Sequence, residues 1–503
     1  MNWHIGDQPQ AQRTPVSFPS SGSISWRSNK TNMNKNRPKK SNFLTGAALV
    51  LAATTSAYGQ APFTQPGTGQ PPTLPAAPKP KPAPADGAPD AKSAPVEEPG
   101  AFEKIFNVKI PEALAKGKFS LNSRLRFEYV DQHGVGTITE PSYAPTIRTR
   151  FGFTSAPLYG FQGMLEGENV TVIGPEENFN AAGSNGVNYK PAVADPPTTE
   201  LNQAWLSYNY TNWITAKLGR QRITLDNHRF IGDVGWRQNM QTYDGATAES
   251  KPLPGLGLYY GYLWDVHRVF GDVDGLPAAN RDFQSASHLI NASYSAWKFA
   301  RFVGYSYLLD LRNEAGAANS SATFGGYFAG AAPINERIAI DYRGEFAVQT
   351  EYADNPQEYQ AEYYNGEIGA IVKPVSFGGG YEVLGTDSND NGVGGVGFKT
   401  PLATLHAFNG WADVFLATPA RGLRDAYAYV QVDLPAQVPV RLIYHKYESD
   451  SAGIDFGQEI NLVASRKFGK YWTALLKYGY YDGKDDPYAF DLHKFWAQIE
   501  FNF

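Results

Sequence analysis

The sequence contains no cysteine and no long apolar run. Because none of its 503 residues is cysteine, disulfides and thiolate metal sites are excluded. No stretch of roughly 18 consecutive apolar residues occurs, so a membrane-spanning helix is not expected. The net charge of −5 argues against a general nucleic-acid-binding protein. A soluble β-rich domain and a membrane protein that spans with strands both remain open.

Aromatic residues are abundant. They make up 14% of the chain, as 30 Tyr, 29 Phe and 10 Trp. Aromatic girdles at the two membrane interfaces of an outer-membrane barrel would use them. A soluble, aromatic-rich sandwich would use them equally well. Composition alone therefore does not separate the two classes, and the spacing of apolar residues has to decide.

A period of two runs through the chain from Lys118 to the C-terminus. In the first such segment Phe119 and Leu125 share one face, whereas Arg124 and Arg126 share the other. This alternation is the signature of β-strands with one apolar face. In a barrel of this length we expect the face of Leu125 to meet lipid and the face of Arg126 to meet the water of a pore.

Short turns alternate with long loops along this region. The short turns are Ala156–Leu158, Thr211–Asn212, Pro252–Gly255, Ala296–Trp297, Ala331–Asn335, Lys373–Pro374, Pro435–Gln437 and Phe468–Lys470. Eight inner turns with both barrel ends on the same side imply about 18 strands, an even number as expected. The sequence therefore predicts an all-β fold, a transmembrane antiparallel β-barrel over residues 118–503. The long loops, such as 174–198, 223–239 and 386–422, would face outside.

The N-terminal region carries targeting features instead of strands. Residues 33–59 have a basic start, the apolar core Phe43–Ala53 and the small-x-small site Ala57–Gly59, which together predict a signal peptide. We expect residues 1–32 to be an upstream extension from a misplaced start codon; a genuine long n-region is the alternative. Residues 60–117 are Pro/Ala-rich and predict a disordered periplasmic linker, a passive spacer in preference to a tether to cell-wall or export components. The mature chain would lie in the outer membrane.

Two long blocks carry a family resemblance. GRQRITLDNHRF (219–230) with GWRQNMQTYD (235–244), and FNGWADVFLATPARGLRD (408–425), resemble the outer-membrane alginate export family. The resemblance covers roughly residues 118–503 and implies a barrel with an arginine-rich conduit for an acidic polysaccharide. The motif residues are Arg220, Arg222, Asp226, Asn227, Arg229, Trp236, Arg237, Asp244, Asn409, Trp411 and Asp413. We expect their carboxylates to hold the loop arginines, and the two Trp side chains to pack into the lumen or to stack on sugar rings.

Inward-facing charges predict the lumen. By alternation the lumen set is Arg124, Arg126, Arg148, Arg150, Arg343 and Arg441, with Glu128 and Glu166 among the carboxylates nearby. Arg220 and Arg222 join this set only if a bulge at Gly219 turns them inward. The guanidinium fork matches carboxylates bidentately, and rows of Arg select anions in pores. The alternative is a lumen braced by internal salt bridges.

Three functions fit these patterns. The first is a channel that passes an anionic polysaccharide or oligosaccharide. The second is a general diffusion porin for small polar or anionic solutes. The third is an outer-membrane hydrolase, which is disfavoured because the eight His are scattered and no G-x-S-x-G occurs. We expect no catalytic residues, metal or cofactor, and a monomer whose partners are the lipid bilayer and an anionic solute.

Overall fold

The structure is a computed structural model that describes residues 104–503 except 212, 274–275, 277, 298 and 388–394. The signal peptide and most of the linker predicted above lie outside the described residues. Two short helical segments, η1 (Ile105–Lys109) and α2 (Ile110–Ala115), immediately precede the first strand. None of the helices in the described part has the length and apolar character to cross a membrane.

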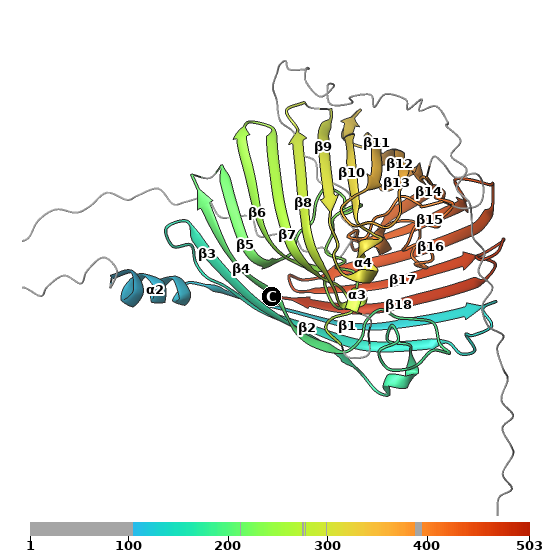
Figure 1. Ribbon diagram of the computed structural model, residues 1–503, viewed down its shortest axis with the longest axis horizontal. Coiled ribbons are helices and arrows are strands. Elements are labelled where there is room, and N and C mark those ends of the chain that lie inside the picture. Colours follow the sequence, from blue (N-terminus) through green and yellow to red (C-terminus); the bar gives the residue numbers. More distant parts are fainter. Residues whose placement is uncertain (1–103, 212, 274–275, 277, 298, 388–394) are drawn as a thin grey trace, which may run out of the picture. The chain divides into compact units, whose positions relative to one another are not determined.

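Eighteen strands form one antiparallel sheet that closes on itself. They are β1 (Lys118–His133), β2 (Ser142–Thr154), β3 (Phe161–Val172), β4 (Thr198–Tyr210), β5 (Ile214–Gln221), β6 (Thr242–Leu253), β7 (Leu256–His267), β8 (Asp282–Tyr294), β9 (Arg301–Leu309), β10 (Ser321–Pro333), β11 (Ile338–Glu351), β12 (Gln360–Val372), β13 (Val375–Leu384), β14 (Leu423–Leu434), β15 (Val438–Glu448), β16 (Asp455–Phe468), β17 (Trp472–Asp482) and β18 (Asp491–Asn502). Strand β1 pairs with both β2 and β18, which closes the barrel (Figure 1). The predicted 18-stranded barrel is confirmed.

Connections alternate between short and long. The short ones join each even-numbered strand to the next odd-numbered strand, from β2–β3 to β16–β17, where the sequence predicts turns. The long connections carry the remaining short helices: η2 (Glu176–Asn178), α3 (Ala278–Arg281), α4 (Glu314–Ala317) and η3 (Leu405–Ala407). All long loops therefore begin and end at one rim of the barrel.

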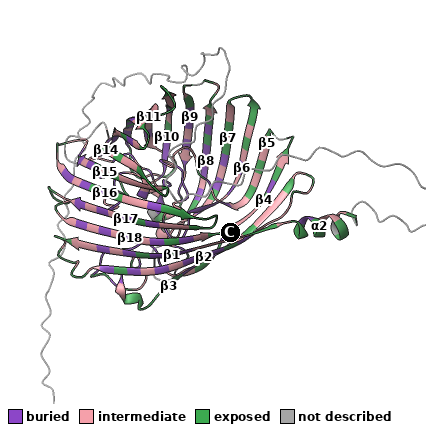
Figure 2. Cartoon of the chain, turned by 180° about the vertical axis from the view of Figure 1, so that it is seen from behind, coloured by how far each residue is buried: buried purple, intermediate pink, exposed green. Residues whose placement is uncertain are grey.

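The two faces of the sheet differ in exposure along many of the strands, as the alternating colours in Figure 2 show. On β1 the Leu125 side chain is 46% exposed, whereas its neighbours Arg124 and Arg126 are 3% and 1% exposed. Exposed apolar residues at alternate positions are the lipid-facing band of an outer-membrane barrel. The expectation that Arg126 meets open water is wrong, because other parts of the chain cover it from the inside.

Two long connections fold back into the barrel instead of remaining outside, and part of the β3–β4 connection, also predicted outside, reaches the interior as well, where Asp195 pairs with Arg126. The first inner loop (residues 222–241) joins β5 to β6, and the second inner loop (the described part of residues 385–422) joins β13 to β14. The backbone of Gly235 contacts Arg124 on β1, and the backbone of Ala412 contacts Glu459 on β16. The prediction that these two loops face outside is therefore wrong for their central parts.

The predicted bulge at Gly219 does not occur. Pairing of β4 with β5 runs in unbroken register through Trp205↔Gly219 and Ala204↔Arg220. The register shifts nearby lie instead between β3 and β4, at Glu166/Gly167, and between β6 and β7. Gly219 does adopt a left-handed φ of 116°, and a Cβ there would lie 2.3 Å from the carbonyl oxygen of Ala204. The residue is needed for this close approach and not for a change of register.

Candidate functional site

Four arginines lie side by side on the inner faces of β1 and β2. Arg124 is directly opposite Arg148 in the register of the two strands, an arrangement that like charges make unfavourable. Glu500 of β18 relieves it, because its carboxylate lies 3.3 Å from Arg124 Nε and 3.2 Å from Arg148 Nη2. Arg150 pairs in the same way with Glu168 of β3. These four residues, Arg124, Arg126, Arg148 and Arg150, are called the ladder below. The carboxylates that balance the ladder come from the two flanking strands.

The ladder also binds the backbone of the first inner loop. Nη1 of Arg124 donates to the carbonyl oxygens of Gly235 (3.1 Å), Trp236 (3.1 Å) and Arg237 (3.3 Å). Nη2 of Arg150 donates to the carbonyl of Gln238 at 3.2 Å. The four arginine residues are consequently at most 8% exposed, so the expected arginine-lined aqueous wall is occupied by the protein's own loop.

Arg237, in the first inner loop, forms ion pairs with the barrel wall and with the second inner loop. Its guanidinium lies 3.2 Å from Glu128 of β1 and 2.9 Å from Asp413 of the second inner loop. Asp413 is shared with Lys494 of β18 at 2.9 Å. Arg237 therefore joins the two inner loops to each other and to the barrel wall.

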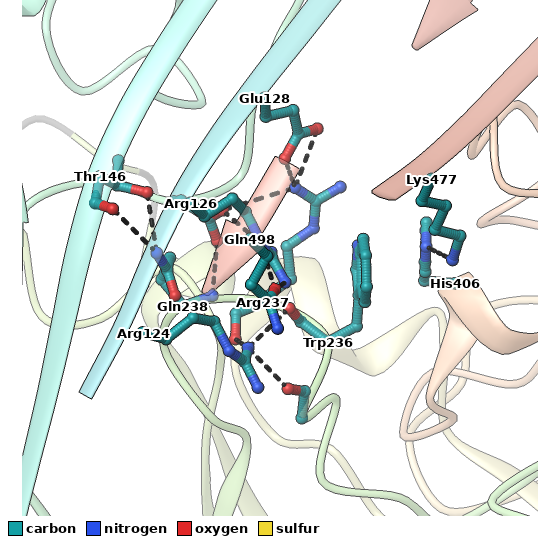
Figure 3. A network of polar contacts seen from close by, with 12 residues as sticks. Arg124, Arg126, Glu128, Thr146, Trp236, Arg237, Gln238, His406, Lys477 and Gln498 are labelled. Atoms are coloured by element: carbon teal, nitrogen blue, oxygen red, sulfur yellow. Dashed lines mark hydrogen bonds and ion pairs between the residues drawn. The ribbon is translucent and has the colours of Figure 1, made fainter. Parts of the chain in front are cut away.

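Trp236 lies between the barrel wall and the second inner loop. Arg126 is 4.2 Å from the centre of the Trp236 ring, and it also donates to Gln498. On the other side the His406 ring stacks on the Trp236 ring, with the ring centres 4.4 Å apart and the ring planes at 5° to each other. Lys477 of β17 lies beside this pair (Figure 3). The tryptophan thus packs into the lumen, one of the two roles expected from sequence.

A second set of contacts ties the two inner loops to β13 and β14. Arg229 binds Glu382 of β13 at 2.8 Å and the amide oxygen of Asn409 at 3.1 Å. The amide nitrogen of Asn409 in turn donates to Glu382 (2.6 Å) and to Asp425 of β14 (3.2 Å). Arg229 and Asn409, from the two family blocks, therefore meet directly at a buried carboxylate.

The other motif residues lie within or beside the first inner loop. Asp226 accepts from Tyr327 at 2.9 Å and from Asn291 at 2.7 Å, so it is held by strand side chains more than by loop arginines. Asn227 accepts from the backbone N–H of Arg229. Arg222 pairs with Asp233, and Arg220 with Asp244 at 2.9 Å. These contacts fix the loop's path.

The remaining predicted lumen residues lie apart from the ladder. Glu166 accepts from Asn202 at 2.7 Å. Arg343 pairs with Glu345 at 2.7 Å, and its guanidinium lies 3.8 Å from the ring centre of Tyr327. Arg441 covers the ring of Tyr429 in the same way, at 4.1 Å. The structure therefore does not bring Arg343 and Arg441 together with the four ladder arginines.

Burial shapes the charge states in the inner loops. Burial holds the pKa of His406 well below its usual range, and Lys477, whose Nζ is 2.6 Å from Nε2, acts in the same direction. Nδ1 of the neutral ring faces Asp413 at 2.6 Å. Burial alone would raise the pKa of Asp413, but the basic groups around it, including Lys494, lower it well below its usual range. Asp413 is therefore the carboxylate on which the two loops and β18 converge.

Cationic groups outnumber carboxylates in this contact network. Its cations are Arg124, Arg126, Arg148, Arg150, Arg237 and Lys494, and its carboxylates are Glu128, Glu168, Asp195, Asp413 and Glu500. Arg148 also has two donors, Nε and Nη1, without an acceptor in the described part of the chain. The contact network therefore has a formal excess of positive charge.

Comparison with known proteins agrees with this architecture. Residues 117–268, which carry the ladder and the first inner loop, match the family model described as alginate export. Over these residues the chain is therefore similar to the alginate export family. The alginate export match ends before the second block, which nevertheless contacts the first through Arg229 and Asn409. No curated protein matches the sequence.

Solved structures share the barrel but little sequence. OpdL of Pseudomonas aeruginosa is 15% identical, with a TM-score of 0.56 over 78% of this chain and 99% of that one. OccK9 (OpdG) of the same organism is 13% identical, with a TM-score of 0.59 over 78% and 100%. OccAB2 of Acinetobacter baumannii is 10% identical, with a TM-score of 0.60 over 78% and 99%. With the alginate export match, this fold places the chain among outer-membrane channels.

Some residues of the network were not singled out from the sequence. Three of them, Glu500, Lys477 and Lys494, lie on the polar faces of β17 and β18. The alternation of polar and apolar residues there predicts that their side chains point into the barrel. His406 and Asp195 lie in long loops without any periodicity, and nothing in the local sequence indicates that they reach the barrel interior. The wall partner of His406, Lys477, is 71 residues away in the chain, and Asp195 accepts from the backbone of Gln238, which is 43 residues away.

Proposed function

We propose that this outer-membrane channel conducts anionic oligosaccharides, above all chains containing uronate sugars, along the inner surface of β1, β2, β17 and β18. The observation that carries the proposal is the excess of cationic over carboxylate groups where this surface meets the inner loops. A low-dielectric wall focuses such a field into the lumen and favours anions there. The alginate export match of the region with the ladder supports a uronate as the solute.

The inner loops favour a selective channel over a wide one. Both family blocks occupy the space beside the ladder, so a solute passes only where they leave room or after they move. Guanidinium groups at successive positions could engage a chain of carboxylates one sugar at a time. Each contact has to remain weak enough to release, as conduction requires several low-affinity sites.

A general diffusion porin is the second candidate. It is favoured by the partners that the ladder already has: Glu500 for Arg124 and Arg148, and Glu168 for Arg150. If these pairs only brace the wall, the lumen would discriminate little between solutes. An enzyme is not proposed, because the family match and the fold are those of channels.

Single-channel recording in planar bilayers separates the two candidates. In a salt gradient we expect a reversal potential on the anion-selective side. We also expect polyuronate to reduce the current, whereas an uncharged glucan of equal length should not. Cation selectivity together with equal effects of both polymers would leave the general porin as the better description.

The remaining assignments complete the proposal. One chain closes its own barrel, so we propose that a monomer in the lipid bilayer forms the pore. Cleavage after residue 59 and a periplasmic spacer over residues 60–117 remain predictions, which N-terminal sequencing of the chain from outer membranes would test.

A further inference from the structure

Lys477 is a buried lysine with an unusual set of partners. It lies on β17, 3% exposed, and its Nζ lies 3.8 Å from the ring centre of Trp411, 4.0 Å from Trp236 and 5.5 Å from Trp496. Within the described residues no carboxylate is in ion-pair distance of it. Three ring faces and the Nε2 of His406, at 2.6 Å, replace a counter-ion. Desolvated ammonium groups are well stabilised by such faces.

The groups around Lys477 come from both inner loops. Trp236 belongs to the first inner loop, whereas His406 and Trp411 belong to the second. Trp236, His406, Trp411 and Trp496 are called the cage around Lys477. Trp236 and His406 also stack on each other, so neither loop can leave without removing part of the cage. Figure 3 shows Trp236 held between Arg126 and the pair formed by His406 and Lys477. Lys477 is therefore a point where one wall residue holds both loops.

The ladder binds the first inner loop through weak acceptors. Arg124 and Arg150 meet backbone carbonyls of residues 235–238. A neutral carbonyl is a poorer acceptor for guanidinium than a carboxylate, whose charge-assisted hydrogen bond is about twice as strong. A solute carboxylate can consequently compete with the loop for the same donors. A neutral sugar cannot compete in this way.

We propose that the cage on Lys477 is a latch that acidic solute opens. Carboxylates of the solute replace the loop carbonyls at Arg124 and Arg150, Trp236 leaves the space between Arg126 and Lys477, and both loops are released from the wall. The released state presents the ladder and Lys477 to the solute, so anions bind it better than the latched state, which is the condition for a population shift. This proposal rests on the anionic solute proposed above and adds how its path opens.

The test uses a reporter for the second inner loop and a matched pair of variants. The chain has no cysteine, so Ala412→Cys introduces a single thiol at a position that is 1% exposed. In this background Trp236→Ala removes the ring between Arg126 and Lys477. The control is Trp205→Ala, because Lys217 lies 4.7 Å from the Trp205 ring and both belong to the barrel wall. Reaction with a water-soluble thiol reagent measures how often the loop opens.

We expect polyuronate to raise the labelling rate of Ala412→Cys by about tenfold, and a neutral glucan to leave it unchanged. With Trp236→Ala the rate should be high without solute and no longer respond to it, while Trp205→Ala should behave like the parent. A rate that polyuronate does not change, or equal rates for the two tryptophan variants, would overturn the latch. If polyuronate still blocks an anion-selective current in that case, the proposed function stands without the latch; if it does not, the function itself fails.

Discussion

At the scale of single residues, the inward arginines depend on partners that are distant in sequence. Arg148 is completely buried, and Glu500 is the carboxylate that contacts it. A buried ion pair adds little stability compared with an apolar pair, but removal of one partner leaves an uncompensated charge. The inward arginines thus stabilise the wall only while their carboxylate partners are present. The same dependence explains why the ladder cannot be read as a row of free donors.

Replacement of Glu500 by Gln tests this dependence. The variant leaves Arg124 and Arg148, which are directly opposite each other, without their shared carboxylate. We expect the free energy of unfolding to fall by about 3–5 kcal/mol, the usual effect of breaking a buried pair. Urea-induced unfolding in detergent or lipid would measure it.

The matched control for Glu500→Gln is Asp272→Asn. Asp272 pairs with Arg281 at 2.9 Å, but its side chain is 86% exposed. Solvent screens such a pair, so the change should be within about 0–1 kcal/mol. Equal effects of the two substitutions would contradict the role assigned to Glu500.

At the scale of elements, strands and loops differ in how far the sequence predicts them. The alternation around Leu125 indicates both the strand and its lipid face, because each side chain direction follows from the period of two. Gly219 shows a limit of this prediction. A bulge there was needed for the alternating pattern to turn Arg220 and Arg222 inward, yet the register is unbroken. Trp236 and Arg237 show another, since a polar loop has no periodicity that says whether it projects outward or folds into the lumen. Their positions depend on Arg124, Glu128 and Asp413, which only the closed barrel brings near.

The lipid face of β1 gives a prediction at this scale. Leu125→Arg places a charge at a position that is 46% exposed on the outer face. If the residue lies near the bilayer midplane, we expect a loss of about 2–4 kcal/mol of folding free energy. Leu125→Ala, which keeps the face apolar, is the control and should cost less. Reversible unfolding into lipid vesicles gives both values, and a charge tolerated as well as alanine would mean that this face does not meet lipid.

At the scale of the whole barrel, two loops from different thirds of the chain close on one wall. The β5–β6 and β13–β14 connections meet through Arg229 and Asn409 and through Trp236 and His406. Both contacts join the two loops, so movement of one weakens the hold on the other. Packed interfaces of this kind favour discrete arrangements over gradual deformation. The permeability of the channel should therefore depend on any condition that changes the balance between the latched and released loops.

Acidity is one such condition. With the loops packed, burial keeps the pKa of His406 well below its usual value, and the ring is neutral between Asp413 and Lys477. After release its pKa returns to about 6.5. Below that pH the released state binds a proton that the packed state does not, so the packed state loses stability as pH falls. The pKa of Asp413 is lowered in the packed state, so its protonation at still lower pH acts in the same direction.

We therefore expect the open probability of single channels to rise as the pH is lowered from about 8 to about 5, across the range in which free histidine titrates. His406→Asn removes this titration and should flatten the profile. Some pH dependence should remain in this variant, because burial also lowers the pKa of His228 in the first inner loop. Ala412→Cys labelling over the same pH range would separate loop release from a direct effect of protons on ion flow. An open probability that stays constant or falls on acidification would show that the burial of His406 does not control the loops.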